Sequence, residues 1–191
     1  MAAKPSVDAS FATWTGVKCS SLQVVNNILP ANVFNSLILT IPGFINNPLA
    51  SDVNTVGFLP GAIFDAVFGP GASTEILGVT FPFVFTQGGV PTDIDSDGNA
   101  DAAFAEIWYN ARFRWNNTGT GPGVDIETVT LHENGHALGL GHFGKIAINE
   151  SNGKLKVSPR AVMNALVLGT LRSPLGTDNS AFCATWGNWS S

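Results

Sequence analysis

The sequence has little charge, few cysteines and no long uninterrupted hydrophobic stretch, and each shortage excludes a class of protein. Charged residues make up 12% of the 191 residues, about half the usual share of a soluble domain. The nine lysines and arginines are scattered and the net charge is -5. Nucleic acid is therefore not expected as a partner, because phosphate binding needs clustered positive charge. No run of about 18 apolar residues occurs, so no membrane span is expected.

The chain is instead rich in apolar residues, at 45%, and it contains 21 glycines and 11 prolines. This hydrophobicity argues against disorder, and the length suits one domain over residues 1–191 with a substantial core. The composition is typical of a loop-rich extracellular protein, so we expect secretion. A monomer is also expected. The first residues lack an apolar signal core, so a secretion signal would have been removed or would lie outside these residues.

Two cysteines, Cys19 and Cys183, lie near opposite ends of the sequence. In an oxidising compartment they could close one large loop and stabilise the fold by a few kcal/mol, roughly, in the chain-entropy model. They could equally be two unrelated buried thiols. The sequence leaves both alternatives open, because spacing alone cannot bring two Cα atoms within bonding range.

Apolar periodicity predicts helices and strands in an order typical of α+β proteins rather than of alternating βαβ units. A first helix is predicted over Val7–Lys18 from its helical spacing of apolar residues. Strand-like runs are predicted at Leu22–Val25, Glu75–Phe85 and Ala102–Trp115. Proline cannot donate to a sheet ladder, so the run that contains Pro82 is expected at a sheet edge.

Other segments give weaker or shorter signals. Phe34–Ile41 is apolar and is followed by proline, and Ala62–Phe68 could be a short helix or a strand. Gly43–Pro60 is rich in Asn, Pro and Gly and is expected to be mostly loop. The polar stretch Lys145–Lys156 is expected to be an exposed loop.

One helix has clear boundaries. Asp125 is a favourable N-cap, and Glu127 suits the first turn of a helix. The helix is expected to run from about Ile126 to Leu138, where Gly139 would end it. Near the end of the sequence, Asp178 could cap a last short helix over residues 179–186.

This helix carries a candidate zinc site. His132 and His136 are four residues apart and therefore share a helix face, so both imidazoles can reach one ion. Glu133 can hold a water beside the metal without ligating it, and zinc with three protein ligands keeps a fourth position open. His142 is the expected third ligand. A left-handed residue at Gly139 would let the chain reverse to bring it back.

A pair of histidines around a glutamate can occur by chance in a helix. The eleven-residue pattern from His132 to His142, HENGHALGLGH, is far more specific, and it uses all three histidines of the protein. We therefore expect zinc on His132, His136 and His142, with Glu133 as the general base that takes a proton from water.

The pattern HExxHxxGxxH resembles the signature of the metzincin zinc peptidases. The sequence resembles in particular the matrixin branch, in a bacterial-type form. Asp125–Leu131 is similar to the matrixin active-site helix, Met163 in RAVMN to its Met-turn, and Asp178–Trp189 to its C-terminal helix. Two departures are Phe143, where many matrixins carry serine, and the lack of Tyr-Pro after Met163.

The resemblance implies a twisted mixed sheet, an active-site helix, a Met-turn beneath the zinc and a C-terminal subdomain over about 143–191. It also implies that a peptide substrate binds as an added strand against a sheet edge. The candidate edge is Leu77, Gly78, Val79 and Thr80, followed by Phe81. This segment could also be an ordinary half-buried strand. A pocket beside the zinc is expected to be lined by helix residues near His132 and by residues such as Ala165 and Leu166.

An acidic stretch is a second candidate metal site. Its potential ligands alternate along the chain: Asp93, Asp95, Asp97, Asn99 and Asp101. Closely spaced carboxylates repel one another without a cation, and calcium takes six to eight oxygen ligands of mixed origin. The twelfth position of an EF-hand would be Phe104 instead of glutamate, which excludes a true EF-hand. We expect structural calcium here, with a solvated acidic turn as the alternative.

The sequence thus predicts a secreted zinc-dependent endopeptidase that acts on extended protein or peptide substrates. Two alternatives remain open. The first is a calcium-stabilised secreted binding module in which zinc is only structural. The second is a zinc hydrolase that acts on a non-protein amide.

Overall fold

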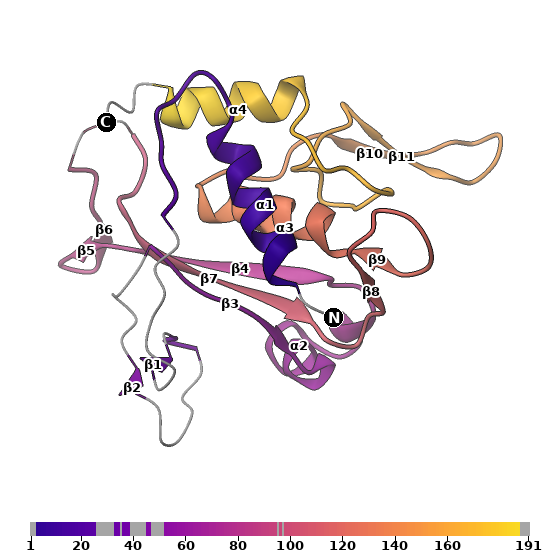
Figure 1. Ribbon diagram of the computed structural model, residues 1–191, viewed down its shortest axis with the longest axis horizontal. Coiled ribbons are helices and arrows are strands. Elements are labelled where there is room, and N and C mark those ends of the chain that lie inside the picture. The colour runs from indigo at the N-terminus through magenta and orange to yellow at the C-terminus, as the bar shows by residue number, and fades with distance from the viewer. Residues whose placement is uncertain are drawn as a thin grey trace. The chain divides into compact units, whose positions relative to one another are not determined.

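The computed structural model describes residues 3–25, 33–34, 36–38, 45–46, 52–94, 96 and 98–187. The chain divides into two compact units, shown with their elements in Figure 1. Unit 1 comprises residues 1–24 and 113–191, and unit 2 comprises residues 25–112. Helices occur together with small parallel and antiparallel sheets, which is the mixed α and β content expected. That all 191 residues form one catalytic domain stays a prediction.

The described part of unit 1 contains three helices and two pairs of short strands. The helices are α1 (Lys4–Thr15), α3 (Ile126–Ala137) and α4 (Gly176–Trp186). Strands β8 (Trp115–Asn116) and β9 (Val124–Asp125) pair in parallel. Strands β10 (Lys145–Ile148) and β11 (Leu155–Ser158) form an antiparallel hairpin.

The core of unit 1 forms where α1 crosses α3 (Figure 1). Trp14 of α1 is fully buried, and its Nε1 donates to the carbonyl of Leu131 at 2.8 Å. Its ring stacks on Phe182 of α4 with ring centroids 5.6 Å apart. Cys19 and Cys183 form a disulfide with their Cα atoms 5.7 Å apart, which decides between the two alternatives left by the sequence. A disulfide is consistent with an oxidising compartment.

Helix α3 has the predicted boundaries to within one residue. The Asp125 carboxylate caps it by accepting the amide of Thr128 at 3.0 Å. The helix ends at Ala137, and Gly139 follows with a φ of 82°. This left-handed conformation is costly for residues with a Cβ atom, so glycine suits the reversal predicted here.

Several predictions for unit 1 were wrong in detail. Helix α1 begins at Lys4 and ends at Thr15, three residues early at each end. Pro5 suits the first turn, where a backbone amide has no partner within the helix. Residues 22–25 form no strand. Lys145–Lys156 is exposed as predicted, but it belongs mainly to the β10–β11 hairpin. The pairing between the two strands is not visible in the pattern of neighbouring residues. Helix α4 starts at Gly176, so Asp178 lies inside its first turn and is not the N-cap.

Unit 2 is built on a mixed sheet with the strand order β3-β7-β4. Its main strands are β3 (Val53–Leu59), β4 (Gly78–Val84) and β7 (Ala102–Asn110). Strand β3 is parallel to β7, whereas β4 is antiparallel to it. Helix α2 (Gly61–Phe68) follows β3 directly, and the 3-10 helix η1 spans Ala72–Thr74. Short strand pairs are β1 (Val33–Phe34) with β2 (Ile45–Asn46), and β5 (Thr86–Gln87) with β6 (Val90–Pro91).

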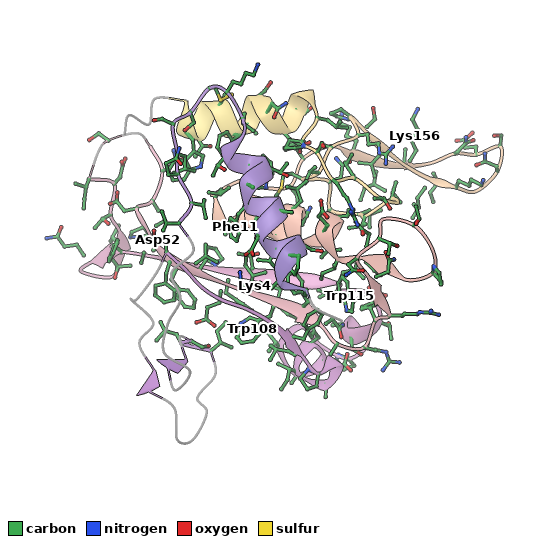
Figure 2. The ribbon with its side chains drawn as sticks, in the orientation of Figure 1. Lys4, Phe11, Asp52, Trp108, Trp115 and Lys156 are labelled. Atoms are coloured by element: carbon green, nitrogen blue, oxygen red, sulfur yellow. A yellow bond between two sulfur atoms is a disulfide. The ribbon has the colours of Figure 1, made fainter. Side chains whose placement is uncertain are left out.

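Strand β7 is the central strand and supplies much of the core of unit 2. Residues 104–110 are all buried, and Trp108 packs with Leu59 and Phe64. Figure 2 labels Trp108 among the side chains of the molecule. Strand β4 lies at the edge of the described sheet with Pro82 opposite Ala105, as predicted. The predicted strand to Trp115 ends earlier, at Asn110. The side chain of Asn110 bonds the backbone of Ser73, Ile76 and Arg112 and turns the chain.

The prediction that Gly43–Pro60 is mostly loop was wrong for its last third, because residues 53–59 form β3. Asn54 and Gly57 gave the segment a loop-like composition, and parallel pairing with a distant strand outweighed it. Most of the apolar segment Phe34–Ile41 lies outside the described residues. No helix in the described ranges is both long and apolar enough to cross a bilayer.

Candidate metal centre

Helix α3 places His132, Glu133 and His136 on one face. Residues three or four positions apart are neighbours on a helix surface, so His136 neighbours both His132 and Glu133. The side chains of His132 and Glu133 are largely buried, at 7% and 5% exposure, and His136 is half-buried. The face that carries the three side chains is therefore largely removed from bulk water.

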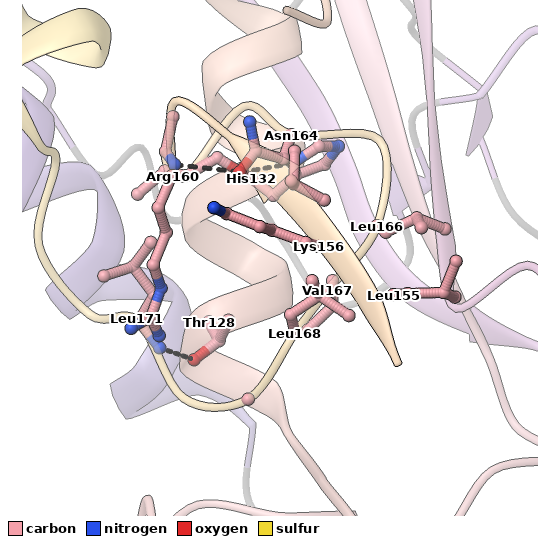
Figure 3. A pocket seen from close by; sticks show the side chains of 14 residues that line it. Thr128, His132, Leu155, Lys156, Arg160, Asn164, Leu166, Val167, Leu168 and Leu171 are labelled. Atoms are coloured by element: carbon pink, nitrogen blue, oxygen red, sulfur yellow. Dashed lines mark hydrogen bonds between the residues drawn. The ribbon is translucent and has the colours of Figure 1, made fainter. Parts of the chain in front are cut away.

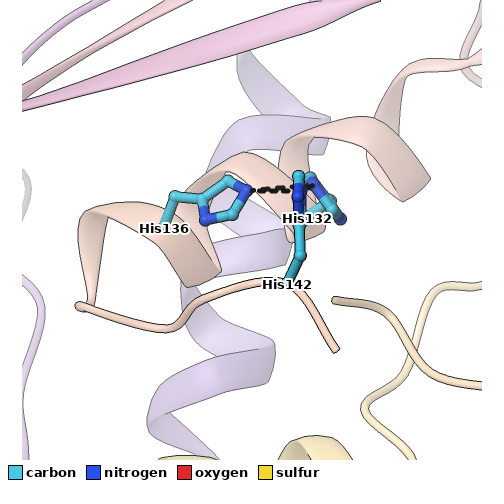
Figure 4. Close-up of side chains that lie close together, drawn as sticks. All are labelled: His132, His136 and His142. Atoms are coloured by element: carbon cyan, nitrogen blue, oxygen red, sulfur yellow. Dashed lines mark hydrogen bonds between the residues drawn. The ribbon is translucent and has the colours of Figure 1, made fainter. Parts of the chain in front are cut away.

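The chain reverses after α3 and brings His142 back to this face. The amide of Leu140 bonds the carbonyl of Gly135 at 2.9 Å, which closes the turn at Gly139. His142 then meets the two helical histidines, and the three rings converge on one point (Figure 4). The Nε2 atom of His132 lies 3.1 Å from that of His136 and 3.0 Å from that of His142. The Nε2 atoms of His136 and His142 are 3.0 Å apart.

The contacts of the Nδ1 atoms show which ring nitrogen carries the proton in His132 and His136. His132 Nδ1 lies 2.7 Å from the carbonyl oxygen of Val162, and His136 Nδ1 lies 2.7 Å from that of Leu140. A carbonyl oxygen can only accept, so each Nδ1 carries the proton and donates it. In a neutral ring Nε2 then holds a bare lone pair, which is the form that ligates a metal.

Neutral rings are favoured at all three positions. The pKa of His132 is lowered to about 4, mainly by burial and to a smaller extent by the charges of His136 and His142. Loss of water around the ring also lowers the pKa of the half-buried His136 and, although the residue is exposed, of His142. Lone pairs that face one another at about 3 Å repel, and a cation between them removes the repulsion. The three histidines therefore fit a metal ion, and imidazole ligands suit zinc among other transition metals.

Neither a protein-family model nor a curated protein matches the chain. The likeness to metzincins therefore rests on the motif and on the geometry of these side chains. Among the residues that the structure describes, the three histidines are the one group of three His, Cys, Asp or Glu side chains with metal-ligand spacing.

The turn at residues 161–164 makes hydrogen bonds to His132 and to the residue that follows His142. Val162 accepts from His132, and the carbonyl of Met163 accepts from the amide of Phe143, the residue after His142, at 3.1 Å. The Met163 side chain is fully buried and its sulfur packs against Gly135, where a Cβ atom would not fit. Met163 thus packs against α3 at Gly135, the residue before His136.

Asp178 holds this turn in place, a role that the sequence reading missed. The carboxylate is fully buried and accepts three backbone amides, from Val162 at 2.9 Å, Met163 at 3.0 Å and Leu175 at 2.8 Å. An acidic residue near a helix start is a visible signal for capping. The bonds to Val162 and Met163 depend on tertiary structure, and no local pattern indicates them.

Arg172 ties the segment after the turn to the start of α3. Its Nε donates to Asp125 at 3.0 Å, and its Nη1 lies 3.0 Å from the carboxylate of Glu127. Burial raises the pKa of Asp125, but hydrogen bonds from Arg172 and Thr128 outweigh it and leave the pKa lowered. The amide of Leu171 also bonds Thr128 Oγ1 at 2.9 Å. Both ends of the segment 161–172 are therefore fixed to the helix or to Asp178.

A pocket of about 270 Å³ opens beside His132 (Figure 3). Its walls come from α3, from the turn and the segment after it, and from strand β11. Of the two residues expected after Met163, Leu166 lines it and Ala165 does not.

The candidate substrate edge belongs to unit 2. Gly78, Val79 and Thr80 are half-buried residues of β4, and Leu77 precedes them and accepts the amide of Asn110 at 2.9 Å. Strand β4 is an edge of the described sheet, as peptide binding by strand addition requires. A substrate role for these residues stays a prediction.

The acidic stretch is only partly described, since Asp95 and Asp97 lie outside the described residues. Asp93 accepts the amide of Gly98 at 3.2 Å, and Asp101 accepts the amide of Ile94 at 3.0 Å. Each of these bonds lies within the loop itself. The two described aspartates of this loop, Asp93 and Asp101, belong to no group of three His, Cys, Asp or Glu ligands among the described residues.

Proposed function

We propose that the chain is a zinc-dependent endopeptidase of the metzincin type. His132, His136 and His142 would hold the zinc, and Glu133 would be the general base. The observation that carries the proposal is the convergence of three imidazole Nε2 atoms, 3.0 to 3.1 Å apart, at a helix that also carries the buried Glu133 directly after His132.

The ligand number supports a catalytic centre over a structural one. Structural zinc sites use four protein ligands, whereas catalytic sites use three and leave one position open. The described residues offer three. When bound, zinc supplies Lewis acidity that polarises a carbonyl group and activates water.

Glu133 supplies the proton transfers that peptide hydrolysis needs. It adjoins His132 in sequence and lies one helical turn from His136, so its carboxylate is carried on the face of the metal site. In the proposed reaction it removes a proton from the attacking water and then delivers that proton to the leaving amine. The C–N bond breaks, and the products are a carboxylate and an amine.

Several further features belong to the proposal. The pocket beside His132 would receive a substrate side chain. Binding of an extended peptide backbone by the edge strand β4 stays a separate prediction from the sequence. The Cys19–Cys183 disulfide supports secretion, because such bonds persist outside the reducing cytosol. Structural calcium at residues 93–101 and a monomeric state are predicted from the sequence alone and are not needed for the chemistry.

The proposal is tested by comparing the zinc-loaded wild type with Glu133→Gln on a mixture of unfolded proteins and fluorogenic peptides. We expect kcat to fall by about 10³-fold in Glu133→Gln, the usual effect of losing a general base, with zinc content unchanged. Glu150→Gln is the matched control, since Glu150 is exposed at the tip of the β10–β11 hairpin. Full activity in Glu133→Gln, or no cleavage by the zinc-loaded wild type, would refute the proposal.

A further inference from the structure

The pocket beside His132 combines an apolar interior with positive charge. Its buried or half-buried walls include Val157, Val162, Leu166 and Leu171. It is also lined by two cations, Lys156 and Arg160, and by no acidic residue. An apolar group can therefore enter the pocket, while any charge that it meets there is positive.

Both cations are exposed residues of the pocket wall. Lys156 lies on β11 and Arg160 follows two residues after its end, and Figure 3 shows both side chains among those that line the pocket. Within the part of the chain that the structure describes, neither is paired with a carboxylate. Arg160 makes one long hydrogen bond, 3.4 Å to the carbonyl of Thr170. Arg172, by contrast, is neutralised by Asp125 and Glu127.

The surrounding sequence reinforces this charge. Residues 145–160 contain four of the nine lysines and arginines of the chain and one acidic residue, Glu150, although the whole chain carries a net charge of -5. The four cations are Lys145, Lys154, Lys156 and Arg160. A cluster of one sign raises the local concentration of ligands of the opposite sign.

We propose that the pocket selects acidic peptides, in which an apolar side chain enters the pocket and a nearby carboxylate binds Lys156 and Arg160. This inference rests on the proposed function, since it names the substrate class of the same site. In an extended peptide, residues two positions apart point to the same side and lie roughly 6.5 Å apart. We therefore expect the selected carboxylate on the peptide residue two positions from the apolar residue.

The test uses three fluorogenic peptides with the same apolar residue after the scissile bond. The residue two positions further is Glu, Gln or Lys. For the zinc-loaded wild type, kcat/KM is expected to be about fivefold higher for Glu than for Gln, and lower still for Lys. This size follows from charge pairs exposed to solvent. The preference should weaken as salt is raised.

Lys156→Gln/Arg160→Gln should bring the kcat/KM values for the Glu and Gln peptides to within twofold of each other. Lys154→Gln is the matched control, because Lys154 is an exposed hairpin lysine that does not line the pocket. Lys154→Gln should keep most of the preference for the Glu peptide over the Gln peptide. Thermal melts check that all variants fold.

The outcomes separate this inference from the proposed function. Cleavage of all three peptides with equal kcat/KM overturns the charge selection and leaves the endopeptidase proposal standing. If the zinc-loaded wild type cleaves none of them, the endopeptidase proposal fails. The charge selection is then decided by fluorescence anisotropy of the same peptides bound to the protein. Equal Kd values for the Glu and Gln peptides overturn it, and tighter binding of the Glu peptide that is lost in Lys156→Gln/Arg160→Gln supports it.

Discussion

The two candidate metal sites differ in how their ligands are held. Two of the three histidines lie on a helix, and the third follows a glycine turn fixed to the same helix by backbone bonds. Each helical histidine also donates to a carbonyl that sets its orientation. In the acidic loop, Asp93 and Asp101 accept amides of their own loop. The helix therefore orients the histidine ligands toward a common point before metal binds. The carboxylates of Asp93 and Asp101 instead accept hydrogen bonds from amides of their own loop.

The largest difference between the two sites should appear in zinc affinity. His136→Ala removes one of three ligands and is expected to weaken zinc binding by about 100-fold or more. Asp101→Asn should leave zinc affinity unchanged. Competition with a chromogenic chelator measures both, and equal effects of the two substitutions would contradict the assignment of zinc to the histidines.

The support beneath the histidines gives the next largest effect. Asp178→Ala leaves three buried amides without their acceptor and should lower the free energy of unfolding by about 3 kcal/mol or more. It should also weaken zinc binding by roughly tenfold, because the Val162 carbonyl that orients His132 is released. Urea unfolding of the metal-free chain and chelator competition measure the two effects.

Asp65→Ala is the control in unit 2. Its carboxylate likewise bonds the amide and hydroxyl of Ser73. We expect it to leave zinc affinity unchanged. If Asp65→Ala and Asp178→Ala weakened zinc binding alike, the link from Asp178 to the metal site would be wrong.

The close approach of Met163 to α3 should give a smaller effect. Gly135→Ala places a methyl group against the Met163 sulfur and should cost about 1–3 kcal/mol of stability, as overpacking usually does. Gly141→Ala is the control, because a Cβ atom there meets no other atom within 4 Å. It should change stability by less than about 0.5 kcal/mol. Thermal unfolding measures both stability changes. Equal losses of stability in the two variants would mean that the contact between Met163 and Gly135 does not constrain the helix.

Calcium should give the smallest effect. If the acidic loop binds calcium, millimolar calcium should raise the free energy of unfolding by roughly 1 kcal/mol through mass action. Asp101→Asn should remove that increase without affecting zinc. Calorimetry of the zinc-loaded protein measures it. A melting temperature that calcium leaves unchanged would mean that the loop is held by its own backbone bonds.

The sequence predicted best where local chemistry decides the structure. The boundaries of α3 followed from Asp125 and Gly139, and the convergence of the histidines followed from their spacing and one turn. The edge position of β4 followed from Pro82. Each of these conclusions needs only a few neighbouring residues.

Features that depend on distant partners were missed or left open. Strand β3 forms because β7 pairs with it, and the β10–β11 hairpin forms through pairs such as Ile146 with Val157. The disulfide and the bonds of Asp178 join segments far apart in sequence, which spacing alone cannot bring together. The support of the metal site is therefore less predictable than the ligands themselves.

X-ray absorption spectroscopy of the zinc-loaded protein tests the central claim most directly. The account predicts one zinc per chain with three imidazole nitrogens at about 2.0–2.1 Å and an oxygen from solvent at the open position. The same spectrum should persist in Glu133→Gln, because Glu133 is not a ligand. A fourth ligand from the protein, or a spectrum without three histidines, would contradict a catalytic zinc centre at His132, His136 and His142.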